Sequence, residues 1–129
     1  MADGRIDLDT DVFVYHLYTS ASNASDFTLS SEGSITNEVA SGNGYVTAGI
    51  TVSAVTWATG ASAKELRFDF SIPILTASGG TIANIKFLVI STTGNELVGW
   101  TRLTTAQFSL TDTNTITYTM PAGGMFELN

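Results

Sequence analysis

The chain has no cysteine, a single histidine and only five basic residues, and these absences exclude several classes of protein. Without cysteine there is no disulfide framework and no thiolate metal site, and one histidine cannot make a two-histidine zinc site. The net charge is −7. Because a nucleic-acid-binding surface needs clustered lysine and arginine to displace counterions, we expect no nucleic-acid partner.

Long apolar runs are also missing. No stretch approaches the roughly 20 residues that a membrane helix needs, so we expect no membrane partner. The first residues, Met1 to Asp7, are acidic and lack the apolar core of a signal peptide. We therefore expect the protein to be made and to fold in a cytoplasm.

What is present is a polar but weakly charged composition. The 129 residues and the mass of 13.6 kDa fit one domain. Charged residues make up 13%, about half of the usual ~25%, and 20 threonines and 13 serines fill polar positions instead. With 43% hydrophobic residues and a mean hydropathy of +0.21, the chain can bury a core and is not a disordered tail.

The dominant pattern is period-two alternation rich in β-branched and aromatic residues, which predicts β-strands. Lys64 to Ile72 is the clearest case, and its alternate apolar residues include Phe68 and Phe70. This pattern predicts a half-buried antiparallel strand with the two phenylalanines as core anchors. Val12 to Thr19 is apolar on both faces, which predicts a central strand covered on both sides.

Turn residues divide the rest of the chain into further short strands. A turn at Thr92 to Asn95 is expected to join two of them in a hairpin. The predicted strands are Ile50 to Trp57, Ile85 to Ser91, Glu96 to Leu103, Phe108 to Leu110 paired with Thr115 to Met120, and a terminal strand Met125 to Leu128.

The segment from Ser20 to Tyr45 is rich in serine, asparagine and glycine and has little periodicity. We expect a long loop with at most one short helix, which Ser34 would cap. A loop this long in a small domain is usually functional or is ordered by a partner.

Together these patterns predict an all-β protein with about seven to nine short strands. The fold is expected to be an antiparallel β-sandwich or a jelly-roll-like barrel, because the strands are short, consecutive and separated by turns. Residues 12–129 form the single predicted domain, and residues 1–11 form an extended N-terminal arm before it.

No catalytic constellation is visible, so we expect no enzyme, no catalytic residue and no cofactor. His16 lies within a predicted strand, and no Gly-x-Ser-x-Gly elbow supports a triad with it. The acidic residues are scattered and do not identify a pair of catalytic carboxylates. We interpret His16 as a strand histidine with a satisfied hydrogen bond.

The run Asp7, Asp9, Asp11 is the one metal-like pattern of acids. An EF-hand loop that began at Asp7 would need glycine and glutamate where this chain has Val12 and Tyr18. Alternating acids could still chelate Ca²⁺ with help from elsewhere. The simpler interpretation is a solvated arm or one that pairs with basic groups of a partner, and we predict no metal ligand.

Aromatic residues leave two interpretations open. An exposed set could stack on the apolar faces of sugars, with a threonine-rich rim to supply hydrogen bonds. The favoured interpretation is that the tryptophans are core or interface anchors. The aromatic residues concerned are Tyr18, Tyr45, Trp57, Trp100 and Tyr118.

Short motifs follow one another along nearly the whole chain. The arm, Gly4-Arg5-Ile6-Asp7-Leu8-Asp9-Thr10-Asp11, leads into an apolar strand that ends in Thr19-Ser20. The later motifs are Asn37-Glu38-Val39, Gly44-Tyr45 before a strand, Leu97-Val98-Gly99-Trp100 in a hairpin, and Thr115-Ile116-Thr117-Tyr118 before a glycine turn. This order resembles a family of small virion proteins of tailed bacteriophages.

The resemblance implies a non-enzymatic structural protein, located in the virion after synthesis in the bacterial host cytoplasm. We predict a capsid decoration (cement) protein that binds the major capsid protein of the same phage on the outer surface of the head. The alternative is a tail or head-fibre component, including a receptor- or carbohydrate-binding module. The family often has an acid-rich segment where this chain has Thr59 to Ala63.

A decoration protein works by burying surface at junctions of the assembled shell, and a threonine-rich surface with few charges loses little hydration on packing. Self-association as a dimer or trimer through a closed interface is also expected. The predicted interface residues are Arg5, Ile6 and Leu8 in the arm and the aromatic residues Tyr15, Trp57 and Trp100.

Overall fold

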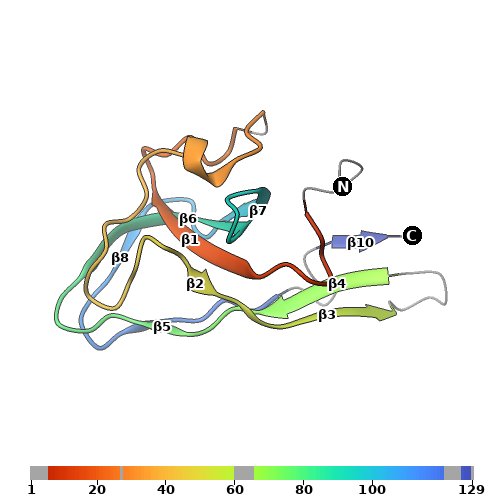
Figure 1. Ribbon diagram of the computed structural model, residues 1–129. Coiled ribbons are helices and arrows are strands. Elements are labelled where there is room, and N and C mark those ends of the chain that lie inside the picture. Colours follow the sequence, from red (N-terminus) through yellow and green to blue (C-terminus); the bar gives the residue numbers. More distant parts are fainter. Residues whose placement is uncertain (1–5, 27, 60–65, 121–125, 129) are drawn as a thin grey trace.

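The computed structural model describes residues 6–26, 28–59, 66–120 and 126–128, and of residues 57–59, 66 and 126–128 it describes the backbone alone (Figure 1). As the alternation predicts, these residues form an all-β fold whose strands, β1 to β10, all pair antiparallel. Within these ranges there is no α-helix, and no sheet closes into a barrel.

The largest sheet has β1 in its interior. β1 (Phe13–Thr19) lies between β2 (Ile50–Thr51) and β6 (Ile82–Thr92), and β7 (Leu97–Arg102) and β8 (Phe108–Leu110) both pair with β6. The predicted central strand and the predicted hairpin, β6–β7, are confirmed. β1 and β6 make the longest contact between two elements, because their register runs along the whole of β1.

The other strands form two smaller sheets. β3 (Ser53–Thr59), β4 (Leu66–Ser71) and β10 (Phe126–Leu128) pair in the order β10-β4-β3. β5 (Leu75–Thr76) pairs with β9 (Thr115–Ile116). Figure 1 shows β3 and β4 extending beyond one end of the largest sheet, and β5 running below it.

The predicted strand Ile50 to Trp57 is wrong, because the chain changes sheets within it. Val52 is buried and its N–H donates to the carbonyl of Phe13 (3.0 Å), where β2 ends and β3 begins. Ala54 then has φ of 51° at a register shift of β3 against β4. A residue in this left-handed conformation breaks the alternation, so Ala54 is exposed although the pattern placed it with Val52.

The predicted pairing of Phe108 to Leu110 with Thr115 to Met120 is also wrong. β8 pairs with β6 and β9 pairs with β5. A turn closed by the Asn114 N–H and the Thr111 carbonyl (3.0 Å) lies between the two strands. Ala77 then exchanges backbone hydrogen bonds with residues of this turn, which brings the chain onto β5 instead of back onto β8.

The two faces of β1 and β6 are covered by different parts of the same chain. Alternate residues of β1 (Phe13, Tyr15 and Leu17) belong to the main core, with the predicted anchors Phe68 and Phe70 of β4. The opposite face carries a smaller cluster beneath the long loop. Its buried members are Tyr18, Ala24, Ile35, Phe87 and Val89. One chain therefore accounts for the apolar character of both faces of β1.

The long segment between β1 and β2 is held by hydrogen bonds to its own chain. The Thr19 N–H donates to the carbonyl of Asn37 (3.0 Å), and the Val39 N–H donates to the carbonyl of Leu17 (2.9 Å). On this edge of β1, β2 pairs only with Val14 and Tyr15. The loop pairs with the same edge at Leu17 and Thr19. Backbone pairing within the chain therefore orders this part of the loop.

The single short helix of the loop is a 3-10 turn, η1 (Glu32–Ser34). Ser31 occupies its N-cap position and makes no side-chain capping bond. The prediction of at most one short helix is confirmed, but Ser34 ends the turn instead of capping it.

Part of the predicted arm, residues 6–11, contains a turn. The Asp11 N–H donates to the carbonyl of Asp7 (2.9 Å), and the Asp7 carboxylate accepts the N–H of Asp9 (2.9 Å). Ile6 and Leu8 are half-buried against the main core. These two apolar residues therefore anchor the described part of the arm to its own domain.

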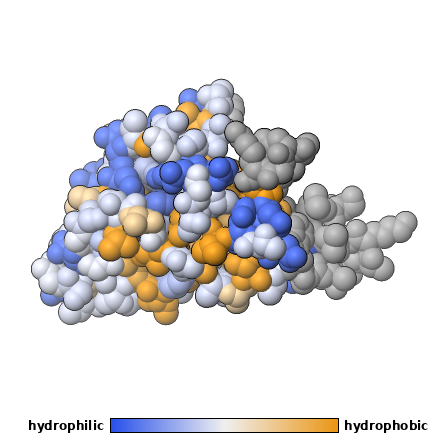
Figure 2. Space-filling view, in the orientation of Figure 1, coloured by the Kyte–Doolittle hydropathy of each residue, from blue (hydrophilic) through white to orange (hydrophobic). Residues whose placement is uncertain are grey.

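Hydrophobic surface gathers in the middle of one face of the molecule, over β2 and the strands beside it (Figure 2). Large exposed apolar side chains occur next to these strands. Val12 (51% exposed) precedes β1, Val46 (49%) precedes β2, and Ile74 (62%) precedes β5.

Replacement of Phe68 by alanine is expected to lower the free energy of unfolding by about 3–5 kcal/mol. Phe68 is fully buried, and its ring lies edge-on to that of Phe13, with centroids 5.5 Å apart. Ile74→Ala removes an exposed side chain and should change stability by no more than about 0.5 kcal/mol. Urea denaturation of both variants measures the difference, and equal effects would contradict the assignment of Phe68 to the core.

Candidate functional site

The most concentrated group of ionisable side chains surrounds His16. Its Nδ1 lies 3.1 Å from Oε1 of Glu38 and 3.7 Å from Oε1 of Glu32. His16 is 4% exposed, and the side chains of Glu32 and Glu38 are 13% and 21% exposed. The three donor atoms lie within 4.8 Å of one another, just beneath the surface.

Backbone pairing of the long loop brings the two glutamates to His16. Glu38 forms an isolated antiparallel bridge with Tyr18 and so lies beside β1, two residues from His16. Glu32 is held from the other side, because its N–H donates to the carbonyl of Asn95 (2.8 Å) in the β6–β7 turn. The group therefore joins the long loop to β1 and to the β6–β7 hairpin.

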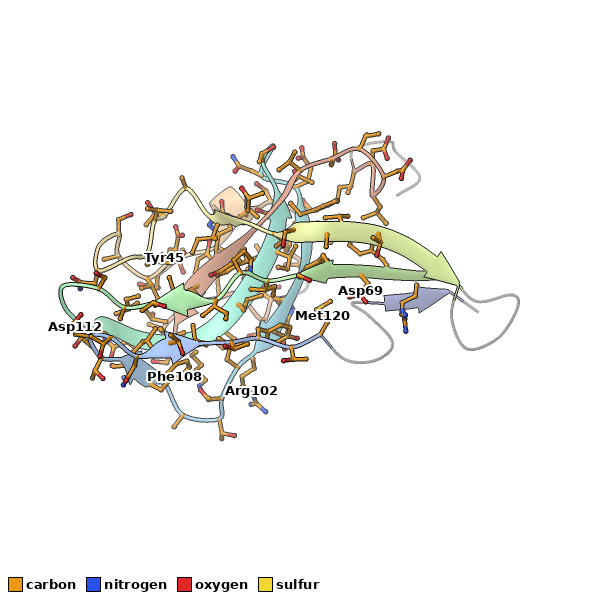
Figure 3. The ribbon with its side chains drawn as sticks, turned by 90° about the horizontal axis from the view of Figure 1, so that it is seen from below. Tyr45, Asp69, Arg102, Phe108, Asp112 and Met120 are labelled. Carbon is orange, nitrogen blue, oxygen red and sulfur yellow. The ribbon has the colours of Figure 1, made fainter. Side chains whose placement is uncertain are left out.

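Two buried tyrosines hold the carboxylates. The Tyr45 hydroxyl donates to Oε1 of Glu38 (2.6 Å) and accepts the N–H of Leu17 (2.9 Å), and the Tyr18 hydroxyl donates to Oε1 of Glu32. Figure 3 shows Tyr45 close to β1. Burial, and then the hydrogen bond to Glu38, raise the pKa of Tyr45 well above its usual range. Burial and the bond to Glu32 raise the pKa of Tyr18 in the same way.

The second imidazole nitrogen and the ring edge are also enclosed. Nε2 of His16 lies 3.3 Å from Oγ of Ser91 on β6. A Cβ atom on Gly49 would lie 2.8 Å from Cε1 and Nε2 of the same ring. Gly49 also has φ of +82°, a conformation that favours glycine. The absence of a side chain at this position therefore makes room for the imidazole.

Hydrogen bonds link Ser91, His16 and Glu38 in the serine–histidine–acid arrangement of a serine-hydrolase triad. The serine, however, is not accessible to a substrate. Ser91 is fully buried in β6, which is interior to the largest sheet. A nucleophile has to reach the reacting carbon, and no part of Ser91 faces solvent. The expectation that His16 is a strand histidine with satisfied hydrogen bonds is confirmed, since both ring nitrogens have partners.

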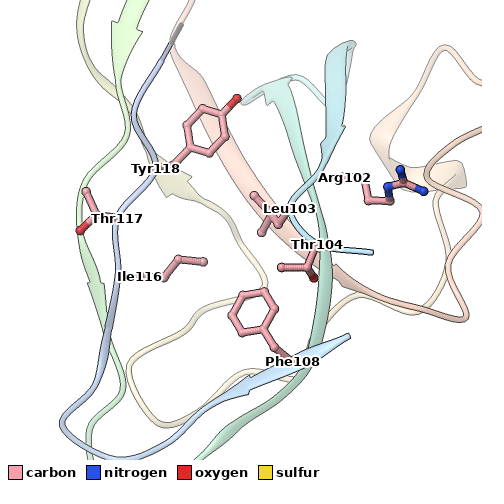
Figure 4. A pocket seen from close by; sticks show the side chains of 7 residues that line it. All are labelled: Arg102, Leu103, Thr104, Phe108, Ile116, Thr117 and Tyr118. Carbon is pink, nitrogen blue, oxygen red and sulfur yellow. The ribbon is translucent and has the colours of Figure 1, made fainter. Parts of the chain in front are cut away.

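A separate cavity of about 300 Å³ opens between the ends of β7, β8 and β9. Figure 4 shows that Leu103, Phe108 and Ile116 face one another across it, while the guanidinium of Arg102 points away. Its other lining residues are Thr104, Thr117 and Tyr118. No carboxylate or histidine lines this cavity, and Tyr118 and Arg102 are its ionisable side chains.

The predicted interface residues lie in different environments. Arg5 and the side chain of Trp57 lie outside the described residues. Ile6 and Leu8 are half-buried on the main core, and Tyr15 is buried within it. Trp100 on β7 is 38% exposed and packs edge-on against Phe87, with ring centroids 6.0 Å apart. These residues form no common patch among those that the structure describes.

The less favoured interpretation, an aromatic platform for sugars, fails for two of the five residues concerned. Tyr18 and Tyr45 are buried and use their hydroxyls on glutamates, so neither presents a ring to solvent. Tyr118 is half-buried at the 300 Å³ cavity.

The Asp7 carboxylate is used within its own turn. It accepts the N–H groups of Asp9 and Thr10, and these bonds lower the pKa of Asp7. The Asp7 N–H in turn donates to a carboxylate oxygen of Asp11 (2.7 Å). The turn thus explains the spacing of these acids without an ion.

Sequence reasoning missed Glu32 and Glu38 as partners of His16. They lie 16 and 22 positions further along the chain, in a segment without periodicity, so no spacing rule connects them to β1. The available signal was chemical: a histidine inside an apolar strand needs polar partners if it is buried.

No family model, no curated protein and no solved structure matches this chain. A helix long and apolar enough to span a membrane does not occur among the described residues.

Replacement of Tyr45 by phenylalanine is expected to destabilise the protein by about 1–3 kcal/mol, because it leaves the buried Leu17 N–H without an acceptor. Tyr15→Phe is the matched control. The Tyr15 hydroxyl makes only a long bond of 3.5 Å to the carbonyl of Pro73, so its loss should have a smaller effect. Urea denaturation compares the two, and an equal loss would contradict the structural role of the Tyr45 hydroxyl.

Gly49→Ala should destabilise the protein more than Gly79→Ala. Both glycines have positive φ, +82° and +79°, so alanine is strained by about 1–2 kcal/mol at each. A Cβ at Gly79 meets nothing within 4 Å, whereas one at Gly49 collides with the His16 ring. The collision should add about 1–3 kcal/mol at Gly49, measured as the difference between the two unfolding free energies. A difference of zero would show that the ring is not confined there.

Proposed function

We propose that the chain is a non-enzymatic structural protein of a phage virion, a decoration protein that binds the outer surface of the capsid. In this proposal its sheets pack as a two-layer β-sandwich, with the main core between the largest sheet and the strands β4, β5 and β9. The protein acts by adding buried surface to a shell that is already assembled, and binding to the assembled state alone stabilises that state by mass action.

The observation that carries the proposal is the apolar surface on a weakly charged molecule. Val12, Val46 and Ile74 each expose about half or more of their surface. Figure 2 shows hydrophobic surface gathered in the middle of one face of the molecule. Apolar patches of this kind mark protein–protein contact sites. Because the chain is rich in threonine and serine and has only five lysine and arginine residues, a partner surface can cover it with little loss of charge hydration.

The order of short motifs along the chain supports a phage virion as the place of this contact, as a resemblance. The buried position of Ser91 agrees with a binding protein, because a buried hydroxyl is not accessible to a substrate. Among the described residues β7 is an edge strand of the largest sheet, paired at its start with Ser30 of the long loop, and an edge strand allows self-association as a dimer or trimer.

The first test is the copy number of the chain in purified particles of the phage that encodes it, measured by quantitative mass spectrometry against the major capsid protein. A ratio near that of the capsid protein supports decoration. A few copies per particle would favour the alternative, a tail or head-fibre component. Absence from the particle would overturn both.

The second test uses binding to shells that lack the protein. Ile74→Asp replaces the most exposed of these three apolar side chains by a charged one and should reduce co-sedimentation with the shells by about tenfold or more, which equals about 1.4 kcal/mol. Thr105→Asp adds the same charge at an exposed position between β7 and β8 and should bind like the wild type. Equal binding of both variants would contradict a contact through Ile74.

A further inference from the structure

The geometry around His16 resembles a set of metal ligands more than an ordinary ion pair. Nδ1 of His16 faces two carboxylate oxygens, at 3.1 and 3.7 Å, and all three atoms lie within 4.8 Å of one another. Two ligands on a tetrahedral ion with bonds of ~2.1 Å are about 3.4 Å apart. The two separations that involve Nδ1 lie on either side of this value, and the three ligand atoms lie within 4.8 Å of one another, so one ion can contact all three after side-chain movements.

The two negative charges of Glu32 and Glu38 also favour the binding of a cation. The two glutamates bring two negative charges beneath the surface, and among the described residues His16 is the basic group within ion-pairing distance of them. A lone pair on Nδ1 and a carboxylate oxygen 3.1 Å away repel each other unless a proton or a metal ion lies between them. A proton at Nδ1 balances at most one of the two charges, whereas a divalent ion balances both.

The surrounding hydrogen bonds orient each of the three side chains. Tyr18 holds Glu32, Tyr45 holds Glu38, and Ser91 lies at Nε2 of His16, the nitrogen that would not bind the ion. Proteins use this kind of outer shell to fix the orientation and the tautomer of metal ligands. Gly49 packs against the imidazole edge and limits its rotation. The site is therefore organised before any ion binds.

We propose that His16, Glu32 and Glu38 bind one divalent transition-metal ion, with Zn²⁺ as the best-fitting ion. One imidazole nitrogen and two carboxylate oxygens are a donor set that Zn²⁺ accepts, whereas Ca²⁺ and Mg²⁺ take oxygen ligands. Water completes the coordination from the side where the carboxylates are partly exposed. The ion fastens the loop between β1 and β2 to β1, because Glu32 and Glu38 lie in that loop and His16 lies in the strand.

Calorimetric titration of the untagged, chelator-treated full chain with Zn²⁺ near neutral pH tests the proposal. We expect one ion per chain and a melting temperature that rises with Zn²⁺ concentration, while Ca²⁺ has no such effect. Glu38→Gln removes one ligand and should weaken binding by about 100-fold or more, and Tyr45→Phe, in the outer shell, by about tenfold. Glu96→Gln makes the same chemical change at a glutamate outside the site and should bind like the wild type. No binding by the wild type, or equal binding by Glu38→Gln, overturns the site.

A second measurement on the wild type does not depend on the folding of any variant. His16 is the only histidine, so its two imidazole ¹⁵N signals need no mutant for assignment. We expect Zn²⁺ to shift the Nδ1 signal at one equivalent while Nε2 keeps its proton. If Nδ1 instead keeps a proton at saturating Zn²⁺, it does not bind the ion and the metal site is overturned.

Discussion

The pairing of β1 with β6 is the constraint on which the rest of the structure depends. Their register runs from Phe13 opposite Thr92 to Thr19 opposite Ile85, and nearly every residue of β1 is buried. Because both faces of β1 are buried, a different part of the chain has to pack against each face. The strands β4, β5 and β9 contribute to the cover of one face, and the loop between β1 and β2 covers the other. Burial on both faces also explains why one small domain needs neither a disulfide nor a second copy to enclose its central strands.

The same constraint creates the polar group that surrounds His16. A histidine in the middle of a doubly covered strand loses its contact with water, so its nitrogens need partners within the protein. The loop that covers this face supplies Glu32 and Glu38, and the buried tyrosines supply hydroxyl donors to them. The fold and the candidate site therefore depend on the same contacts. Glu32 and Glu38, which hold the loop against β1, are also the proposed metal ligands.

Much of the fold could be predicted because strand periodicity is local. Alternation identified β4 and its buried Phe68, and the unbroken apolar run identified β1 as central. The failures occurred where a backbone irregularity interrupts the period. Ala54, with positive φ, shifts the register of β3, and the turn before β9 sends the chain to β5. Ala54 gives no residue signal, since alanine is not a typical turn former. The turn before β9 contains Asp112 and Asn114, which indicate a turn but not which strand the chain pairs with after it.

The sequence by itself determined the all-β class, the antiparallel pairing, the central position of β1 and the core role of Phe68 and Phe70 in β4. These properties follow from side-chain period and composition within short windows. Only the tertiary structure decided which strand pairs with β8 and β9, what covers the second face of β1, and which acids meet His16. Those contacts join residues that are far apart in the chain. The folded backbone sets their geometry, and the spacing of residues within a short window does not predict it.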